Sequence, residues 1–326
     1  MNYIESSKSY TGTELDSVFF RPMLSGASSA NLGVKVLYNM PVPTTVHIWG
    51  HDQDVLKDNT SGGWSGASKN IAAQCTIDMK RVKAELAFSA ADYYSLVFEN
   101  VSLRDEVNLD DLTGTTLESV ETEIFRDAMM ESIRATMWVG NESRAEGKYG
   151  SFTGFITRLF TSIVAQDITP ISITSDNLTD PDQAIEIFDK LWDTADIKVQ
   201  AAKASGRLAY YVTTDIYTLY EKALDAAGVD TSYVDSINGR TELRYHGIPV
   251  IDMRVSSYLN SYGPSETMAF LTMQDNLVMA VNTADFPGTE IRMWYNPDEM
   301  ENRQRAIFAV GCEVLDPSLV SMYVPE

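Results

Sequence analysis

Residues 289–325 read TEIRMWYNPDEMENRQRAIFAVGCEVLDPSLVSMYVP, and this stretch decides the fold class. Its apolar and β-branched residues predict strands. One strand ends at a Trp–Tyr pair, a charged turn with Arg303 and Arg305 follows, and another strand passes through a glycine to an Asp–Pro pair. Two earlier segments, YHGIPVIDM (245–253) and ETMAFLTMQDNLVMAVN (266–282), have the same character. The end of the chain is therefore predicted to be a run of strands, and no catalytic group stands out in it.

The centre of the chain alternates between helices and strands. Asp180-Pro-Asp predicts the start of a helix with an acidic cap and a proline in the first turn, and the helical pattern continues to Gly206. Residues 208–213 predict a buried strand, and 215–227 predict a helix that Gly228 ends. Such alternation, with antiparallel strands at both ends of the chain, is typical of the α+β class.

The clearest helix is predicted over residues 115–139. Thr115-Thr-Leu-Glu118 has the pattern of a capping box, and Gly140 ends the helix. At about 1.5 Å per residue the helix spans roughly 36 Å, the length of a small domain. Two adjacent apolar stripes follow the helical period, one of Leu117, Val120, Ile124 and Ala128, the other of Phe125, Met129, Ile133 and Met137.

Residues 33–98 predict a long hairpin-like excursion. Apolar and polar residues alternate along it, and a tip rich in Gly and Ser, DNTSGGWSGAS (58–68), lies in its middle. The alternation slips at Lys80–Arg81, which indicates a bulge or a bend. A two-stranded ribbon is marginally stable in water by itself. We therefore expect Trp49 and Trp64 to be covered by a neighbouring copy, at a subunit interface.

The charge of the chain excludes one class of function. The 326 residues include 25 Lys and Arg against 46 Asp and Glu, which gives a net charge of −21. Tight sequence-independent binding of nucleic acid requires clustered basic residues that neutralise phosphates. A role in reading DNA is therefore not expected, whereas a wall that only encloses DNA is compatible with an acidic chain.

The cysteines and the apolar runs limit the cellular location. Cys75 and Cys312 lie far apart in the sequence, with no metal-binding or disulfide spacing. The first residues are polar and lack the apolar segment of a signal peptide. No run of about 18 apolar residues occurs, so a membrane span is not expected. The sequence predicts a soluble chain made in the cytoplasm, with no membrane partner.

Two patterns in the segment 47–58 resemble metal sites. His47 and His51 are four residues apart, a spacing that binds zinc on a helix, but their neighbours predict strand and turn and no third ligand is evident. Asp52, Asp54 and Asp58 resemble a calcium loop that lacks the required glycine and glutamate. No metal site is predicted.

The sequence contains no complete catalytic or cofactor motif. Gly147–Lys148 fails as a phosphate loop because the preceding glycine is too far away and a tyrosine replaces the Ser or Thr. Neither the dinucleotide fingerprint nor the nucleophile elbow occurs. His246 could act as a general base, but no Ser or Cys partner is favoured by its context, so a structural role is the better interpretation. We predict no catalytic residue and no cofactor.

The order of these elements resembles the Hong Kong 97-type fold of tailed-bacteriophage major capsid proteins. The resemblance covers nearly the whole chain from residue 33, is strongest at 115–159 and 245–317, and depends on element order more than on any short motif. The domains that it implies are an N-terminal arm (1–32), an extended loop (33–98), a peripheral domain (99–170 and 286–326) with the long helix as its spine, and an axial domain (171–285).

The resemblance implies a structural protein without enzymatic activity. Copies would assemble into hexamers and pentamers, then into an icosahedral head that encloses double-stranded DNA. The chain would be part of the virion, assembled in the cytoplasm of a bacterial host. Many members begin with a helical scaffolding segment, whereas Met1 here leads almost directly into the arm, so the resemblance implies a separate scaffold protein or none. Portal and decoration proteins are the other partners that it implies. The alternatives are an encapsulin-like nanocompartment shell, a tail or sheath component, and a soluble α+β hydrolase using His246.

Overall fold

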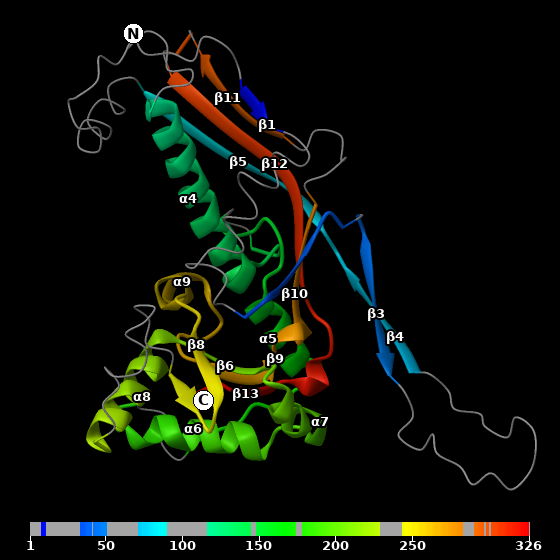
Figure 1. Cartoon of the computed structure of the whole chain (residues 1–326), viewed down its shortest axis with the longest axis vertical. Helices are drawn as coiled ribbons and strands as arrows, with labels where there is room; N and C mark the ends of the chain where they lie inside the picture. The colour runs from blue at the N-terminus through cyan, green and yellow to red at the C-terminus, as the bar shows by residue number, and fades with distance from the viewer. Residues whose placement is uncertain are drawn as a thin grey trace, which may run out of the picture.

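The described residues fold into two sheets, several helices and a projecting two-stranded ribbon (Figure 1). The computed structural model describes residues 8–10, 33–40, 42–50, 71–89, 116–144, 148–173, 178–228, 243–282, 290–296, 298–299 and 301–325. At 8–10, 48–50, 71–73, 88–89, 116–121, 290 and 295 it describes the backbone alone. In these ranges no helix combines the length and the apolar character needed to cross a membrane.

The larger sheet has six strands and is organised by one long strand, β12 (Glu301–Val314). β5 (Lys80–Ser89) pairs with one edge of β12 in antiparallel register. The other edge pairs first with β11 (Glu290–Asn296) and then with β10 (Leu277–Asn282). Two short strands complete the sheet, β1 (Lys8–Tyr10) beside β11 and β2 (Lys35–Tyr38) parallel to β10.

The smaller sheet has five strands in the order β13-β9-β6-β8-β7. Its bounds are β13 (Ser321–Tyr323), β9 (Ala269–Met273), β6 (Leu208–Val212), β8 (Ile248–Asp252) and β7 (Arg244–Tyr245). β6 is buried throughout, as predicted for residues 208–213. Tyr210 lies in the core formed with α6 (Asp182–Asp193) and α8 (Thr214–Ala226), and Tyr211 lies in the other core. The sheet therefore separates two apolar cores.

The long helix predicted from the sequence is α4 (Thr116–Val139), which lies along the larger sheet (Figure 1). One of its two predicted stripes, Phe125 to Met137, is buried in the core with β11 and β12. The other stripe is not a core face where it is described, because Ile124 is half-buried and Ala128 is exposed. Thr115 and the side chain of Glu118, the predicted capping box, lie outside the described residues.

Gly140 directly follows α4, and close backbone contacts require a glycine at this position. Its N–H donates to the carbonyl of Thr136, and a Cβ at this position would lie 2.3 Å from the carbonyl oxygens of Phe152 and Thr136. The chain then turns into α5 (Phe155–Val164), which packs against α4 and β12. Only a residue without a side chain permits this approach.

Trp138, near the end of α4, connects the two sheets. Its side chain is fully buried, with its ring centroid 5.4 Å from that of Phe155 on α5. It also contacts Tyr211 and Phe270 of the smaller sheet, at 5.9 and 6.3 Å. The Tyr211 hydroxyl donates to the carbonyl of Gly33, just before β2. This aromatic cluster therefore joins α4, α5, the smaller sheet and the start of the larger one.

Short helices complete the described part of the fold, and α9 (Ser256–Tyr262) among them was not predicted. α7 (Ile197–Ala201) and a 3-10 turn (Ala202–Ser205) continue the predicted helical segment to Gly206. Gly206 and Gly228 both have positive φ angles, of 68° and 75°, and end their helices as predicted. The remaining helix, α9 (Ser256–Tyr262), interrupts the segment that the sequence predicted as strands.

The pairing of the strands corrects the predicted hairpin over 33–98. Only β3 (Thr44–Gly50) and β4 (Ile71–Ile77) form the separate two-stranded sheet, called the ribbon below. β2 and β5 belong to the larger sheet. The chain changes partners at Asp78–Met79, close to the predicted slip at Lys80–Arg81, since pairing with β3 ends at Ile77 and pairing with β12 begins at Lys80. This junction is called the bend below.

Arg303 and Arg305 also lie in a different element from the predicted turn. Both are within β12, where Arg303 is opposite Trp294 and Arg305 is opposite Arg292 of β11. The turn between β11 and β12 is shorter than predicted, since Asn296 already pairs with Glu301. The physical reason is that alternate positions of β12 face solvent, so strand residues can carry charge on that face.

Replacement of Trp138 tests the connection between the sheets. Trp138→Ala is expected to lower the free energy of unfolding by about 3–5 kcal/mol, because it opens a cavity where four elements meet. Urea unfolding of the unassembled chain measures this loss. Val164→Ala is the control, since that side chain is 84% exposed, and its effect should stay within about 0.5 kcal/mol. A Trp138→Ala loss no larger than that of the control would contradict the proposed connection.

Candidate functional site at the base of the ribbon

The ribbon has one covered face and one exposed face along its described side chains. Thr44 and Ile77, directly opposite each other, are buried, and the next pair on that face, Val46 and Cys75, is half-buried. The other face carries exposed polar residues in alternate positions, namely Thr45, His47, Gln74 and Thr76. The ribbon base therefore has an inside and an outside, as expected for a strand pair that rests on a surface.

The surface beneath the ribbon base belongs to the same chain. Ile77 and Met79 are almost fully buried and form a small core with Val278, Ala280 and Ala309 of β10 and β12. This corrects part of the expectation that the ribbon's apolar residues depend on a neighbouring copy. The base is covered internally because the bend at Asp78–Met79 brings it onto the larger sheet.

Gly311 permits the close approach of that bend. A Cβ on Gly311 would lie 2.5 Å from the carbonyl oxygen of Asp78 and 3.1 Å from Cα of Met79. Real Cβ atoms do not approach backbone oxygen this closely, so the glycine allows β12 and the bend to touch directly. The position of Gly311 in a strand is thus explained by backbone contact.

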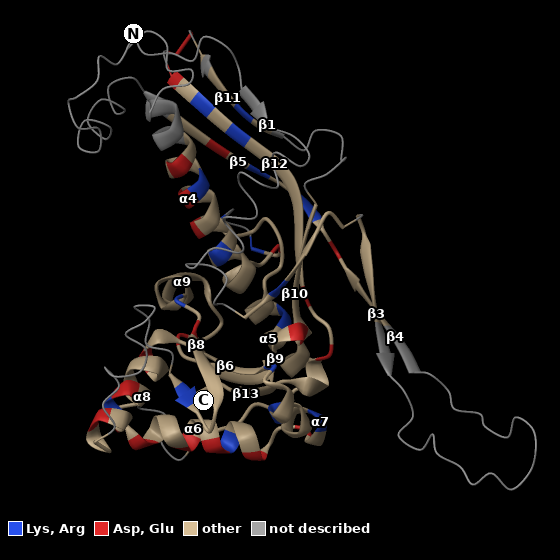
Figure 2. Ribbon diagram, in the orientation of Figure 1, with Lys and Arg blue, Asp and Glu red and all other residues tan. Residues whose placement is uncertain are grey.

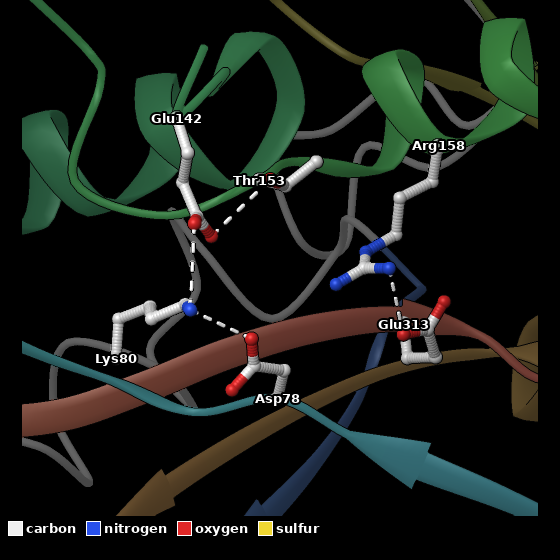
Figure 3. A network of polar contacts seen from close by, with 6 residues as sticks. All are labelled: Asp78, Lys80, Glu142, Thr153, Arg158 and Glu313. Atoms are coloured by element: carbon white, nitrogen blue, oxygen red, sulfur yellow. Dashed lines mark hydrogen bonds and ion pairs between the residues drawn. The ribbon is translucent and has the colours of Figure 1, made fainter.

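Three charged side chains connect the bend to the segment between α4 and α5 (Figure 3). Lys80 Nζ lies 2.7 Å from Asp78 Oδ2 and 3.5 Å from Glu142 Oε2. Glu142 in turn accepts a hydrogen bond from the Thr153 hydroxyl, at 3.3 Å. The hydrogen bond to Asp78, followed by the charge of Glu142, raises the pKa of Lys80, so this side chain is charged at neutral pH.

A second ion pair lies deeper, between α5 and β12. Arg158 Nη1 is 2.7 Å from Glu313 Oε2, and their side chains are only 24% and 16% exposed. Burial raises the pKa of the Glu313 carboxyl above its ordinary value, although the Arg158 charge acts in the opposite direction. Figure 3 shows Arg158 reaching from α5 toward Glu313, beside the strand that leads to Asp78.

The predicted interface residues are not brought together by the described part of the structure. Trp64 lies outside the described residues, and Trp49 is described only by its backbone at the far end of β3. His47 is exposed on the ribbon, whereas His51, Asp52, Asp54 and Asp58 lie outside the described residues. Within the described ranges no group of three His, Cys, Asp or Glu side chains could hold a metal ion.

His246 is part of a hairpin turn. It lies with Gly247 in the turn between β7 and β8, and both residues have positive φ angles, of 48° and 85°. Two consecutive positive φ angles are typical of a type I′ hairpin turn. The imidazole is exposed and packs edge-on against Tyr245, 4.4 Å between ring centroids. Lys148 is also exposed, and Gly147 lies outside the described residues.

Sequence reasoning missed the residues that build the ribbon base. A signal was present, because Arg158 and Glu313 are single charges within apolar runs and the slip at Lys80–Arg81 marked the bend. The sequence does not say that α5 and β12 meet, so the two charges could not be paired in advance. Gly311 likewise gave no sign of which backbone approaches it.

Comparisons with known proteins show which solved structures share the fold of this chain. Neither a protein-family model nor a curated protein sequence matches this chain. Among solved structures, it is similar to a chain from the procapsid of satellite phage P4 including the size determination (Sid) protein. The TM-score is 0.59 at 12% sequence identity, over 94% of this chain and 97% of that chain.

Two further structures have the same fold. The capsid of a native GTA particle gives a TM-score of 0.50 at 13% identity, over 91% of this chain and 89% of that chain. The capsid of Myoviridae phage XM1 gives 0.50 at 10% identity, over 92% of each chain. The chain thus has the mixed α/β fold found in phage capsids, and the capsid-protein resemblance predicted from the sequence is confirmed at the level of the fold.

Substitution of Gly311 tests the backbone contact at the bend. Gly311→Ala is expected to lower the free energy of unfolding by about 1–3 kcal/mol, because its Cβ would overlap the Asp78 carbonyl and force the bend away from β12. Urea unfolding measures the loss. Gly228→Ala serves as the comparison, since a Cβ there meets open space and only the positive φ angle opposes it. Wild-type stability in Gly311→Ala would show that the contact is unimportant.

The raised pKa of Glu313 predicts a pH dependence. As the pH falls, the folded chain takes up this proton before the unfolded chain does, so this group's contribution to stability increases. The window runs from the raised pKa down to the ordinary value of 4.5. Glu313→Gln should remove this contribution, which urea unfolding at a series of pH values measures. An unchanged difference between variant and wild type across the window would contradict the assignment.

Proposed function

We propose that this chain is the major capsid protein of a tailed bacteriophage, a structural subunit without catalytic activity. Its copies assemble into hexamers and pentamers and then into an icosahedral head that encloses double-stranded DNA. One observation carries the proposal: the fold matches a chain of a phage procapsid over 94% of this chain and 97% of the other.

The proposal extends to the Hong Kong 97-type division of the chain. α4 is the spine of a peripheral domain (99–170 and 286–326), and the helix lies on β12 and its neighbouring strands. The axial domain (171–285) contains most of the smaller sheet together with α6 and α8. The final strand, β13, pairs with β9 of that sheet, so the last residues of the chain link the two proposed domains.

The ribbon is proposed as the contact between copies. Its base rests on its own chain, while β3 and β4 continue away from both sheets (Figure 1). A two-stranded sheet is marginal alone, so a surface on another copy would stabilise it. In this proposal Trp49 and Trp64 supply apolar contacts, and the arm (1–32) makes further contacts. Many weak contacts of this kind become strong together when a closed shell forms.

The distribution of charge supports enclosure of DNA without tight binding. Figure 2 shows acidic residues along α6 and α8 and basic residues on the long strands of the larger sheet. Several basic residues already have acidic partners, since Arg303 contacts Glu299 and Glu301, and Lys83 pairs with Glu85. With a net charge of −21, such a wall leaves packaged DNA free to move. Scaffold, portal and decoration proteins are the further proposed partners.

Electron microscopy of the expressed chain tests the proposal. The wild-type chain is expected to form closed shells, together with the rings of copies from which such shells are built. A variant that lacks residues 59–68, the ribbon tip, should fail to form shells while it keeps the far-UV circular dichroism of the folded chain. Both results follow from a ribbon that holds copies together.

Three outcomes would count against the proposal. Normal shells from the shortened variant would remove the ribbon from assembly. A small, defined oligomer of the wild-type chain would favour a soluble enzyme. A cargo enzyme in place of DNA inside purified particles would favour an encapsulin-like compartment. Helical particles in place of closed ones would favour a tail or sheath component.

A further inference from the structure

Two connections carry the chain between the two sheets, and they run side by side. Residues 274–276 lead from β9 of the smaller sheet to β10 of the larger one, and residues 315–320 lead back from β12 to β13. β9 pairs with β13 in the smaller sheet, and β10 pairs with β12 in the larger sheet, both in antiparallel register. The same two segments therefore continue from one sheet into the other (Figure 1). These two connections are called the neck below.

The regular pairing of strands is interrupted within the neck. A 3-10 turn, Gln274–Asn276, occupies one connection, and another, Pro317–Leu319, occupies the other. The Leu315 N–H still donates to the carbonyl of Asn276, at 3.0 Å. Beyond that point side chains join the two connections.

Asn276 makes these contacts from a buried position, at 4% exposure. The Asp316 N–H donates to Asn276 Oδ1 at 2.8 Å, and Asn276 Nδ2 donates to the Asp316 carbonyl at 2.9 Å. Nδ2 also donates to Thr272 Oγ1 at 3.0 Å, and that hydroxyl donates to the Leu319 carbonyl at 3.0 Å. The amide thus pairs with both polar groups of one backbone residue across the neck, and both of its donors are used.

The bonds of Asn276 restrict the geometry of the neck more strictly than apolar packing does. The cluster around Trp138 also joins the two sheets, but apolar attraction has no direction and depends mainly on the area that is buried. Hydrogen bonds weaken steeply away from their preferred distances and angles. A satisfied buried amide therefore favours one arrangement of the two connections, because any other arrangement leaves buried polar groups without partners.

Asp275, the preceding residue, bridges the two sheets at the surface. Its carboxylate lies 3.7 Å from Lys35 Nζ on β2 and 3.2 Å from Arg207 Nη1, just before β6. The three side chains are 49–67% exposed. Exposed ion pairs contribute little to stability, since water screens the charges and the side chains lose freedom. Asp275 is therefore expected to restrict the neck much less than Asn276 does.

We propose that Asn276 is the positioning residue that fixes the angle between the smaller and the larger sheet. Each sheet has its own packed helices, so this angle determines the shape of the subunit. The use of that shape rests on the proposed function. In a closed shell, the angle between neighbouring copies follows from the shape of the subunit that they share. Asn276 then determines the curvature of the shell, and with it the diameter.

Pulsed electron paramagnetic resonance of the unassembled chain measures the arrangement of the two sheets. Spin labels are attached through Lys83→Cys on β5 and Lys222→Cys on α8, both at exposed positions, in a Cys75→Ser background. Cys312 is fully buried and stays unlabelled as long as the chain is folded. With Asn276 present, the distribution of distances between the two labels should be single and narrow.

Asn276→Asp should shift and broaden this distribution. The substitution keeps the shape of the side chain but replaces its two donors by an oxygen that faces the Asp316 carbonyl. Asn302→Asp is the matched control, because Asn302 is an equally buried amide, at 3% exposure, at the opposite end of β12 from the neck. Asp275→Asn is the control within the neck. Both controls should leave the distribution as it is in the wild type.

Electron microscopy of the same variants without labels measures the effect on assembly. Asn276→Asp should form particles whose diameters differ from that of the wild type or vary among themselves. Both controls should form particles of the wild-type diameter. If Asn276→Asp does not fold, Thr272→Val replaces it, since it removes a hydroxyl from the same network and should produce a smaller shift.

The two measurements separate the steps of the proposal. An unchanged distance distribution in Asn276→Asp, or an equal shift in Asn302→Asp, overturns the positioning role of Asn276. A shifted distribution together with particles of the wild-type diameter overturns the effect on curvature. Failure of the wild-type chain to form shells contradicts the proposed function and removes the effect on curvature with it, whereas the distances between the labels still decide the positioning role.

Discussion

The direct contact between the backbone at Asp78 and Gly311 of β12 is the constraint on which the arrangement of the ribbon depends. On one side of this contact the chain belongs to the ribbon, as β4 paired with β3. On the other side it belongs to the larger sheet, as β5 paired with β12. A side chain at 311 would separate the two backbones, so the absence of a single Cβ determines where the ribbon leaves the sheet.

The body of the protein holds that contact in place. α4 packs along the larger sheet, and Trp138 near its end is fixed between α5 and the smaller sheet. α5 then directs Arg158 toward Glu313, and the segment before it places Glu142 beside Lys80. In the proposed shell, a body held together in this way would fix the shape of each subunit, and the projecting ribbon would be the part that contacts neighbouring copies.

Patterns within one element were predicted well, and contacts between distant elements were not. The spacing of Phe125, Met129, Ile133 and Met137 predicted α4 and its buried face, because the helical period is a local property. The alternation along β5 has the same period whichever strand it pairs with, so its pairing with β12 could not be distinguished from a hairpin. α9 was missed since it is short and lacks a strong apolar period.

The residues of the candidate site could likewise be predicted only in part. The phase slip marked the bend, and the lone charges at Arg158 and Glu313 were visible, but their meeting depends on how α5 crosses β12. Trp49 and Trp64 stay predictions, because the contacts proposed for them involve a second copy of the chain.

A cryo-electron microscopy map of assembled particles, at a resolution that traces side chains, would show what the ribbon contacts. We expect closed particles in which the ribbon of each copy, residues 44–50 and 71–77, lies against a different copy, with its base still attached to its own β12. A particle in which the whole ribbon folds back onto its own chain and contacts no neighbour would contradict it.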